Sequence, residues 1–142
     1  MRTRFRYSDK FGCYTLEKRG LIARASFSGA FGATMLKEFD KNIKELATSF
    51  QPHYWGYLSF SKLAEAANSE AEAALTQLLS TALALGCRAE AHCLSNPLII
   101  EQTRRARIRA GITSPIEDIL FDSEEEAEKH ILSVLNKINK NV

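Results

Sequence analysis

The segment at residues 57–75, YLSFSKLAEAANSEAEAAL, brings Ser69 to the point where an aromatic, strand-like stretch changes into an alanine-rich helical one. Open α/β proteins bind ligands at such junctions of strand and helix. A serine at a helix start also has a structural role, because its hydroxyl accepts a backbone N–H of the first turn. Ser69 and Glu72 have the S-x-x-E spacing of a capping box, which favours the structural role.

The segment EQTRRARIRAG carries four arginines within six residues, namely Arg104, Arg105, Arg107 and Arg109. On a helix these side chains cover a broad arc that can meet an acidic protein, a phosphate-bearing ligand or RNA. The alternative is a solvated face whose partners are the acidic segments at 117–128. Because no exposed aromatic residues are interleaved with the arginines, nucleic acid is not favoured.

The tetrapeptide GAFG, residues 29–32, lies between an expected strand and an expected helix, where backbone N–H groups can hold an anion. It lacks the third glycine of a dinucleotide loop and the Gly-Lys-Ser/Thr ending of a phosphate-binding loop, so a tight turn eased by two glycines is favoured. The residues predicted to bind a ligand lie in or beside the strand-to-helix loops: Gly29, Phe31, Gly32, Lys62 and Ser69.

Aromatic residues concentrate on one expected strand, at Tyr54, Trp55, Tyr57 and Phe60. Residues of a strand alternate between its faces, so most of this set should pack in the core. If the helices cover the sheet incompletely, part of the set should instead line an apolar pocket with Phe27 and Phe31, near the carboxyl ends of the strands.

The residue types that carry catalysis or bind metals do not form a recognisable set. His92 and Cys93 are neighbours on an expected strand, so they point to opposite faces and cannot share a metal. We find no nucleophile with a nearby base, no paired carboxylates and no cofactor fingerprint, and we expect a non-enzyme without cofactor or metal. The alternative is an enzyme that uses Cys93 or Cys87 as its nucleophile.

Composition limits the class of protein. A chain of 142 residues, 45% hydrophobic and 25% charged, fits a single globular domain over residues 1–142. The net charge of +2 does not by itself indicate nucleic acid or an anionic membrane. Three cysteines without CxxC spacing fit a reducing cytoplasm, and no apolar signal or membrane-spanning segment is recognisable.

The elements that must position these residues follow from hydrophobic periodicity and capping signals. Phe5 and Tyr7, in an arm at residues 1–11, either add an edge strand or belong to a loose segment. The expected order is a hairpin of strands 13–17 and 21–27 turning near Gly20, a helix at 35–50, a strand at 54–60, a helix at 70–85, a strand at 88–94, a helix at 98–110 after an Asn96 cap, a short strand at 116–121, and a C-terminal helix opened by Ser123 and Glu126. This order predicts an α/β fold: a small mixed, largely parallel sheet of four to five strands with an N-terminal hairpin and about four helices.

This arrangement resembles the STAS domain, and within it the short stand-alone proteins described as sporulation anti-anti-sigma-factor-like. The resemblance spans residues 13–138 and is carried by GLIARASFSGAF, HYWGYLSFSKL, RAEAHCLSNP and IEDILFDSEEEAEKHI. In the sigma-regulating members, a serine at the start of the second helix is phosphorylated by a partner kinase. This chain has no Asp-Ser-Ser-Gly motif there, and Ser69 is the nearest serine by position.

The resemblance implies a cytoplasmic binding or regulatory domain that recognises a protein partner or a small apolar or anionic ligand through its strand-to-helix loops. The arginines of the 98–110 segment are the predicted partner-binding residues. A phospho-switch with Ser69 as acceptor is the second hypothesis, and the cysteine-dependent enzyme is the third. The ligand, the partner and the oligomeric state are not predicted.

Overall fold

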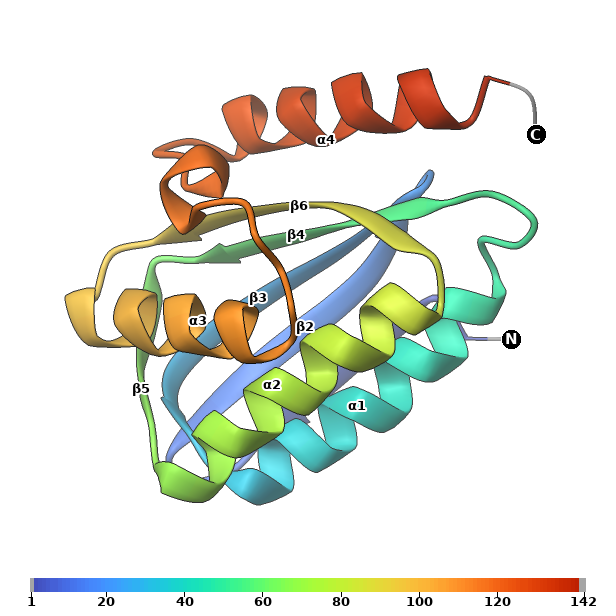
Figure 1. Ribbon diagram of the computed structural model, residues 1–142. Helices are drawn as coiled ribbons and strands as arrows, with labels where there is room; N and C mark the ends of the chain where they lie inside the picture. The colour runs from blue at the N-terminus through green and yellow to red at the C-terminus, as the bar shows by residue number, and fades with distance from the viewer. Residues whose placement is uncertain (1, 141–142) are drawn as a thin grey trace.

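The chain folds into a mixed sheet with helices on both faces in the computed structural model, which describes residues 2–140 (Figure 1). Met1, Asn141 and Val142, which belong to the expected domain, lie outside the described residues. The strands are β1 Arg4–Ser8, β2 Gly12–Arg19, β3 Ile22–Phe31, β4 Trp55–Ser61, β5 Leu63–Ala67 and β6 Cys87–Leu94. The helices are α1 Ala33–Thr48, α2 Ser69–Ala84, α3 Pro97–Arg109 and α4 Glu124–Ile138, with a short 3-10 helix, η1, at Ile116–Ile119.

The predicted α/β class is confirmed, with a mixed sheet and four helices among the described residues. The strand order is β1-β2-β3-β4-β6, with the first two pairs antiparallel and the pairs β3–β4 and β4–β6 parallel. The β2–β3 hairpin turns at Gly20 as expected, since its φ of 59° is in the left-handed region that favours glycine. The arm forms the edge strand β1 rather than a loose segment.

The predicted count of four to five strands is too low, because β5 was not foreseen. β3 is ten residues long, and its first half pairs with β4 while its second half pairs with β5. The sequence of β5, LAEAA, has little intrinsic preference for a strand. Its small residues Ala64 and Ala67 are buried, which lets a backbone strand pass between β3 and α3 where larger side chains would not fit.

Helices α1, α2 and α3 lie on one face of the sheet and α4 lies on the other (Figure 1). Strand β4 divides its side chains accordingly: Tyr57 faces the three-helix layer, and Leu58 packs against α4. Gly56 lets α4 approach closely, since a Cβ atom there would lie 2.4 Å from Cγ2 of Ile131. On the three-helix face, Ser59 and Ser61 of β4 and His92 of β6 are buried.

The predicted strand at 116–121 is wrong. Residues Ile116–Ile119 form η1, and only Leu120 makes a single bridge, to His92 of β6. Ile116 and Ile119 are both buried, and their spacing of three residues suits the three-residue turn of a 3-10 helix.

The predicted Ser69–Glu72 capping box is also wrong. Asn68 is the N-cap of α2: its backbone is extended, and its side-chain oxygen accepts the Ala71 N–H at 2.9 Å. Ser69 is the first helical residue, so it does not occupy the capping position. The two other caps are confirmed, with Asn96 accepting from Leu98 N and Ser123 accepting from Glu126 N.

Candidate ligand-binding cavity

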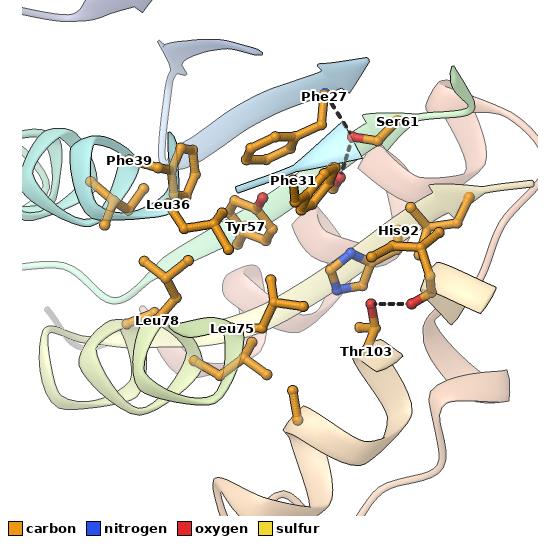
Figure 2. A pocket seen from close by; sticks show the side chains of 17 residues that line it. Phe27, Phe31, Leu36, Phe39, Tyr57, Ser61, Leu75, Leu78, His92 and Thr103 are labelled. Carbon is orange, nitrogen blue, oxygen red and sulfur yellow. Dashed lines mark hydrogen bonds between the residues drawn. The ribbon is translucent and has the colours of Figure 1, made fainter. Parts of the chain in front are cut away.

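A cavity of about 80 Å³ lies between the sheet and the three-helix layer, next to the C-terminal halves of β3, β4 and β6 (Figure 2). Figure 2 shows side chains from the sheet, α1, α2 and α3 converging on this space. The wall is mainly apolar and includes Phe27, Phe31, Leu36, Phe39, Leu75 and Leu78. The predicted apolar pocket is thus present, although of the strand aromatics only Tyr57 lines it; Trp55 stacks on Phe50 in the turn after α1, and Phe60 packs against α4.

Polar groups of two neighbouring parallel strands form part of the cavity wall. Ser59 and Ser61 of β4 bond each other through their hydroxyls at 2.6 Å, and Ser61 Oγ also accepts the Phe27 N–H at 3.0 Å. The Tyr57 hydroxyl interacts with Ser59 on the same face, and burial outweighs this interaction and raises the Tyr57 pKa. These hydroxyls satisfy one another, as buried polar groups must.

His92 of β6 lies opposite Ser59 in the register of the sheet and lines the same cavity. Its Nε2 is 2.8 Å from Oε2 of Glu90, which precedes it by two residues and so faces the same side of the strand. The second Glu90 oxygen accepts from Nη1 of Arg107, and Nη2 of Arg107 donates to the Ser114 carbonyl and hydroxyl. His92, Glu90 and Arg107 thus form a buried polar chain that links the cavity to α3.

The Glu90 carboxyl keeps its charge in this chain. Its burial alone would raise the pKa, but the hydrogen bonds from His92 and Arg107 and the positive charge of Arg107 outweigh burial and lower the Glu90 pKa below its ordinary value. Arg107 is always protonated, so the pair is a buried ion pair. A buried carboxylate that accepts two donors from opposite sides is fixed in position, and it fixes the ring of His92 in turn.

A second hollow, the edge groove, lies along the outer side of β6 between the end of α2, the segment at 112–119 and α4. Its free volume is about 410 Å³, and it shares Tyr57, Leu79 and Ala82 with the cavity. Arg88, Glu90, Asp118 and His130 contribute polar groups to the edge groove. The edge groove and the cavity are therefore neighbours, and Tyr57 and the C-terminal half of α2 form the wall between them.

The helix that covers the cavity is loosely packed. Of the sixteen residues of α2, only Ala71 is fully buried, whereas seven residues of α1 are. Leu75, Leu78 and Ala82 are only partly buried although they face the core. These apolar side chains border unfilled space rather than interlocking with the sheet.

The predicted ligand-binding residues are only partly brought together at the cavity. Phe31 lines it. Gly29 belongs to β3, with a φ of 84°, and Gly32 is the N-cap of α1, so GAFG ends a strand instead of forming an anion-binding loop. Lys62 lies exposed in the turn between β4 and β5, and Ser69 is exposed at the start of α2.

The predicted arginine surface is wrong for Arg107, which is 2% exposed and cannot contact a partner. The other three arginines have partners on this chain: Arg104 pairs with Glu101 and Glu117, and Arg105 and Arg109 both lie near Glu72. The alternative prediction, that the arginines pair with acidic residues of the same chain, agrees with these contacts. Of the acidic partners, only Glu117 comes from the expected segments at 117–128. Glu72, assigned above to a cap, is instead the partner of α3.

The two buried cysteines lack the features of a nucleophile. Burial raises the pKa of Cys87 to about 12, and its thiol donates to the Ala89 carbonyl at 3.4 Å. Burial also raises the pKa of Cys93, whose side chain faces α4 and not the cavity. Both thiols are therefore protonated near neutral pH, which gives the cysteine-dependent enzyme no support.

Sequence reasoning missed the buried polar groups of β4 and β6, although the signal was present. In YLSFS and RAEAHCL, polar residues alternate with apolar ones, so Ser59 and Ser61 share a face, as do Glu90 and His92. Strands between two helix layers usually carry apolar residues on both faces. Polar residues on an enclosed face are the exception that marks this site.

Comparison with known proteins adds no assignment, since no protein-family model, no curated protein and no solved structure matches the chain. The resemblance to the STAS domain therefore stays a prediction. Within residues 2–140, no helix is long and apolar enough to cross a membrane. The cavity and its polar chain are the observations from which a function can be inferred.

Proposed function

We propose that this protein is a non-enzymatic, STAS-like binding domain that holds a small, largely apolar ligand in the cavity beneath α2. The observation that carries the proposal is unfilled apolar space under a loosely packed helix. Protein interiors are packed as densely as organic crystals, so such space costs stability unless something fills it. Apolar concavities with a few placed polar groups are the usual form of a small-molecule site.

A small ligand is favoured over a protein partner by the state of the arginines. A surface that recognises an acidic partner needs guanidinium groups that are free to bind it. Arg105 donates to Glu72 at 2.7 Å, and Arg107 is buried against Glu90. Binding an acidic partner on α3 would first require these internal pairs to break.

A cytoplasmic location is supported by the cysteines. Cys13 is exposed on β2, and all three cysteines are free thiols. An exposed free thiol persists in a reducing compartment and is prone to oxidation outside it. This argument concerns the chemistry of the thiol and is independent of the resemblance to the STAS domain.

The proposal is tested by titrating the ¹⁵N-labelled protein with toluene and following amide shifts. We expect saturable shifts confined to residues around the cavity, such as Phe31, Leu75 and Thr103. The variant Ala82→Leu adds three carbon atoms at the cavity wall and should abolish binding. Its matched control is Ala84→Leu, which makes the same change on an exposed position of α2 and should bind toluene like the unmodified protein. No localised saturable shift, or equal binding by both variants, would contradict the proposal.

A phospho-switch at Ser69 is the second candidate, and one observation favours it. Because Asn68 caps α2, the Ser69 hydroxyl is exposed and has no capping function that phosphorylation would disrupt. Against it, Glu70 and Glu72 place negative charge in the same turn. Intact-mass measurement of protein from its own host distinguishes the candidates: one phosphate mapped to Ser69 supports the switch, and an unmodified chain that binds toluene supports the ligand site.

A further inference from the structure

One nitrogen of His92 lacks a partner inside the cavity. The His92 side chain is 7% exposed, its Nε2 bonds Glu90, and no residue between 2 and 140 bonds its Nδ1. The other polar groups near it are engaged, since Ser59 and Ser61 bond each other and Thr103 donates to the Ile99 carbonyl. The unpartnered Nδ1 borders accessible space instead of being sealed inside the protein, and His92 lines the cavity, so this nitrogen is a place for a ligand to bond.

The chemistry of that nitrogen follows from its neighbours. An ionised carboxylate only accepts hydrogen bonds, and one oxygen of Glu90 already accepts from Arg107. The 2.8 Å contact between Glu90 Oε2 and His92 Nε2 therefore requires the proton to be on Nε2. In the neutral imidazole, this leaves Nδ1 with a lone pair and no proton.

The charged groups bonded around His92 already balance each other. Glu90 and Arg107 compensate each other, and these are the charged groups bonded into the chain around His92. The other neighbours of the ring include Tyr57, whose ring centroid is 5.8 Å from that of His92, the engaged hydroxyls of Ser59 and Thr103, and the apolar wall. His92 Nδ1 is thus a hydrogen-bond acceptor on a side chain that is 7% exposed.

We propose that the ligand is a small apolar molecule with one hydroxyl group, an alcohol or a phenol, which donates its hydrogen bond to Nδ1 of His92. The proposal rests on the proposed function and specifies its ligand class. Figure 2 shows the His92 ring pointing into the space that Phe31, Tyr57 and Leu75 also face, so a molecule bonded to Nδ1 would have its apolar part among these side chains. Glu90 and Arg107 do not touch this molecule, and they act by holding the ring and its tautomer.

The size of the cavity adds a condition. A cavity that binds benzene has on the order of 150 Å³, and the space present is about 80 Å³. A single-ring ligand therefore requires Leu75 and Leu78 of α2 to move outward, toward the edge groove that adjoins the cavity at Leu79 and Ala82. The half-buried state of these leucines allows such a movement.

The test compares phenol with toluene, which have nearly the same shape and differ in the hydroxyl donor. In amide-shift titrations, the phenol-to-toluene affinity ratio should fall by about three- to tenfold in His92→Phe relative to the unmodified protein, as expected for one neutral hydrogen bond. A His92→Phe protein that binds both probes with an unchanged ratio would overturn the proposal. If the unmodified protein binds neither phenol nor toluene, the proposed function is overturned as well.

A second measurement needs no variant, which matters because His92→Phe leaves Glu90 with one partner fewer. The ¹⁵N spectrum of the imidazole in the unmodified protein should show a protonated Nε2 and an unprotonated Nδ1 near neutral pH. Addition of phenol, but not of toluene, should shift the Nδ1 resonance. A protonated Nδ1, or an equal response to both probes, would overturn the assignment of His92 as the acceptor.

Discussion

The ion pair between Glu90 and Arg107 is the residue-scale feature on which the site depends. Arg107 is 2% exposed, and Glu90 lies between it and His92. Buried pairs bring little net stability relative to apolar replacements, because desolvation offsets the attraction. Their retention in a small core fits a positioning role, here the orientation of His92.

The stability losses from changing the two partners of this pair should not be additive. We expect Arg107→Met to lower the free energy of unfolding by about 3–5 kcal/mol, because Glu90 is left as a buried charge without its main counter-ion. Glu90→Gln should also destabilise, and the double variant should lose clearly less than the sum of the two single changes. Urea unfolding followed by far-ultraviolet circular dichroism measures all three values.

The control for this cycle is Arg104→Met, on the same helix. Arg104 pairs with Glu101 and Glu117 at the surface, where solvent screens the interaction. Arg104→Met should therefore lower the free energy of unfolding far less than Arg107→Met. Additive losses in the double variant would mean that Glu90 and Arg107 do not act as a unit.

At the scale of elements, two adjacent polar residues at the start of α2, Asn68 and Ser69, have different roles. Asn68→Ala should lower the free energy of unfolding by about 1 kcal/mol, because the Ala71 N–H loses its acceptor. Ser69→Ala should change stability by less than about 0.5 kcal/mol, since an exposed first helical residue has no such bond. Urea unfolding of the two variants decides the matter, and a larger effect at Ser69 would restore the predicted capping box.

The elements that could be predicted from the sequence are those whose local signals agree with the tertiary structure. The helix at 35–50 was predicted from periodicity, and the helix at 98–110 and the C-terminal helix combined periodicity with caps; their observed bounds differ by a few residues only. β5 could not be found, because its alanines signal a helix and its pairing with β3 is a tertiary effect. At 116–121, a hydrophobic pattern fitted both a strand and the observed 3-10 turn.

The candidate site was predictable in place but not in chemistry. Aromatic residues near the carboxyl ends of parallel strands indicated an apolar pocket, and Phe27, Phe31 and Tyr57 do line one. The role of His92 depends on which face of β6 is enclosed and on the arrival of Arg107 from α3, and neither can be read from spacing. Arg107 was predicted to lie on the surface, and its contact with Glu90 explains why it is buried instead.

At the scale of the whole molecule, the helices differ in how closely they pack against the sheet. α4 packs directly on β4 and β6 through Ile131 and Leu135, which are both buried. α1 covers β3 with seven buried residues, whereas α2 has one and adjoins both hollows. Segments with few buried apolar contacts open locally at low free-energy cost, so α2 is the element through which a ligand can reach the cavity.

Hydrogen exchange followed by mass spectrometry tests this difference. Amides in the middle and C-terminal part of α2, residues 74–84, should exchange by local opening, well before those of α1 at 35–47, which should exchange only on global unfolding. Both helices have sixteen residues, so α1 is the internal reference for α2. Saturating toluene should slow exchange in α2 and leave α1 unchanged, because filling the cavity gives Leu75 and Leu78 the contacts they lack. Equal exchange of the two helices in the free protein would mean that α2 is as firmly packed as α1, and ligand access by movement of α2 would then be excluded.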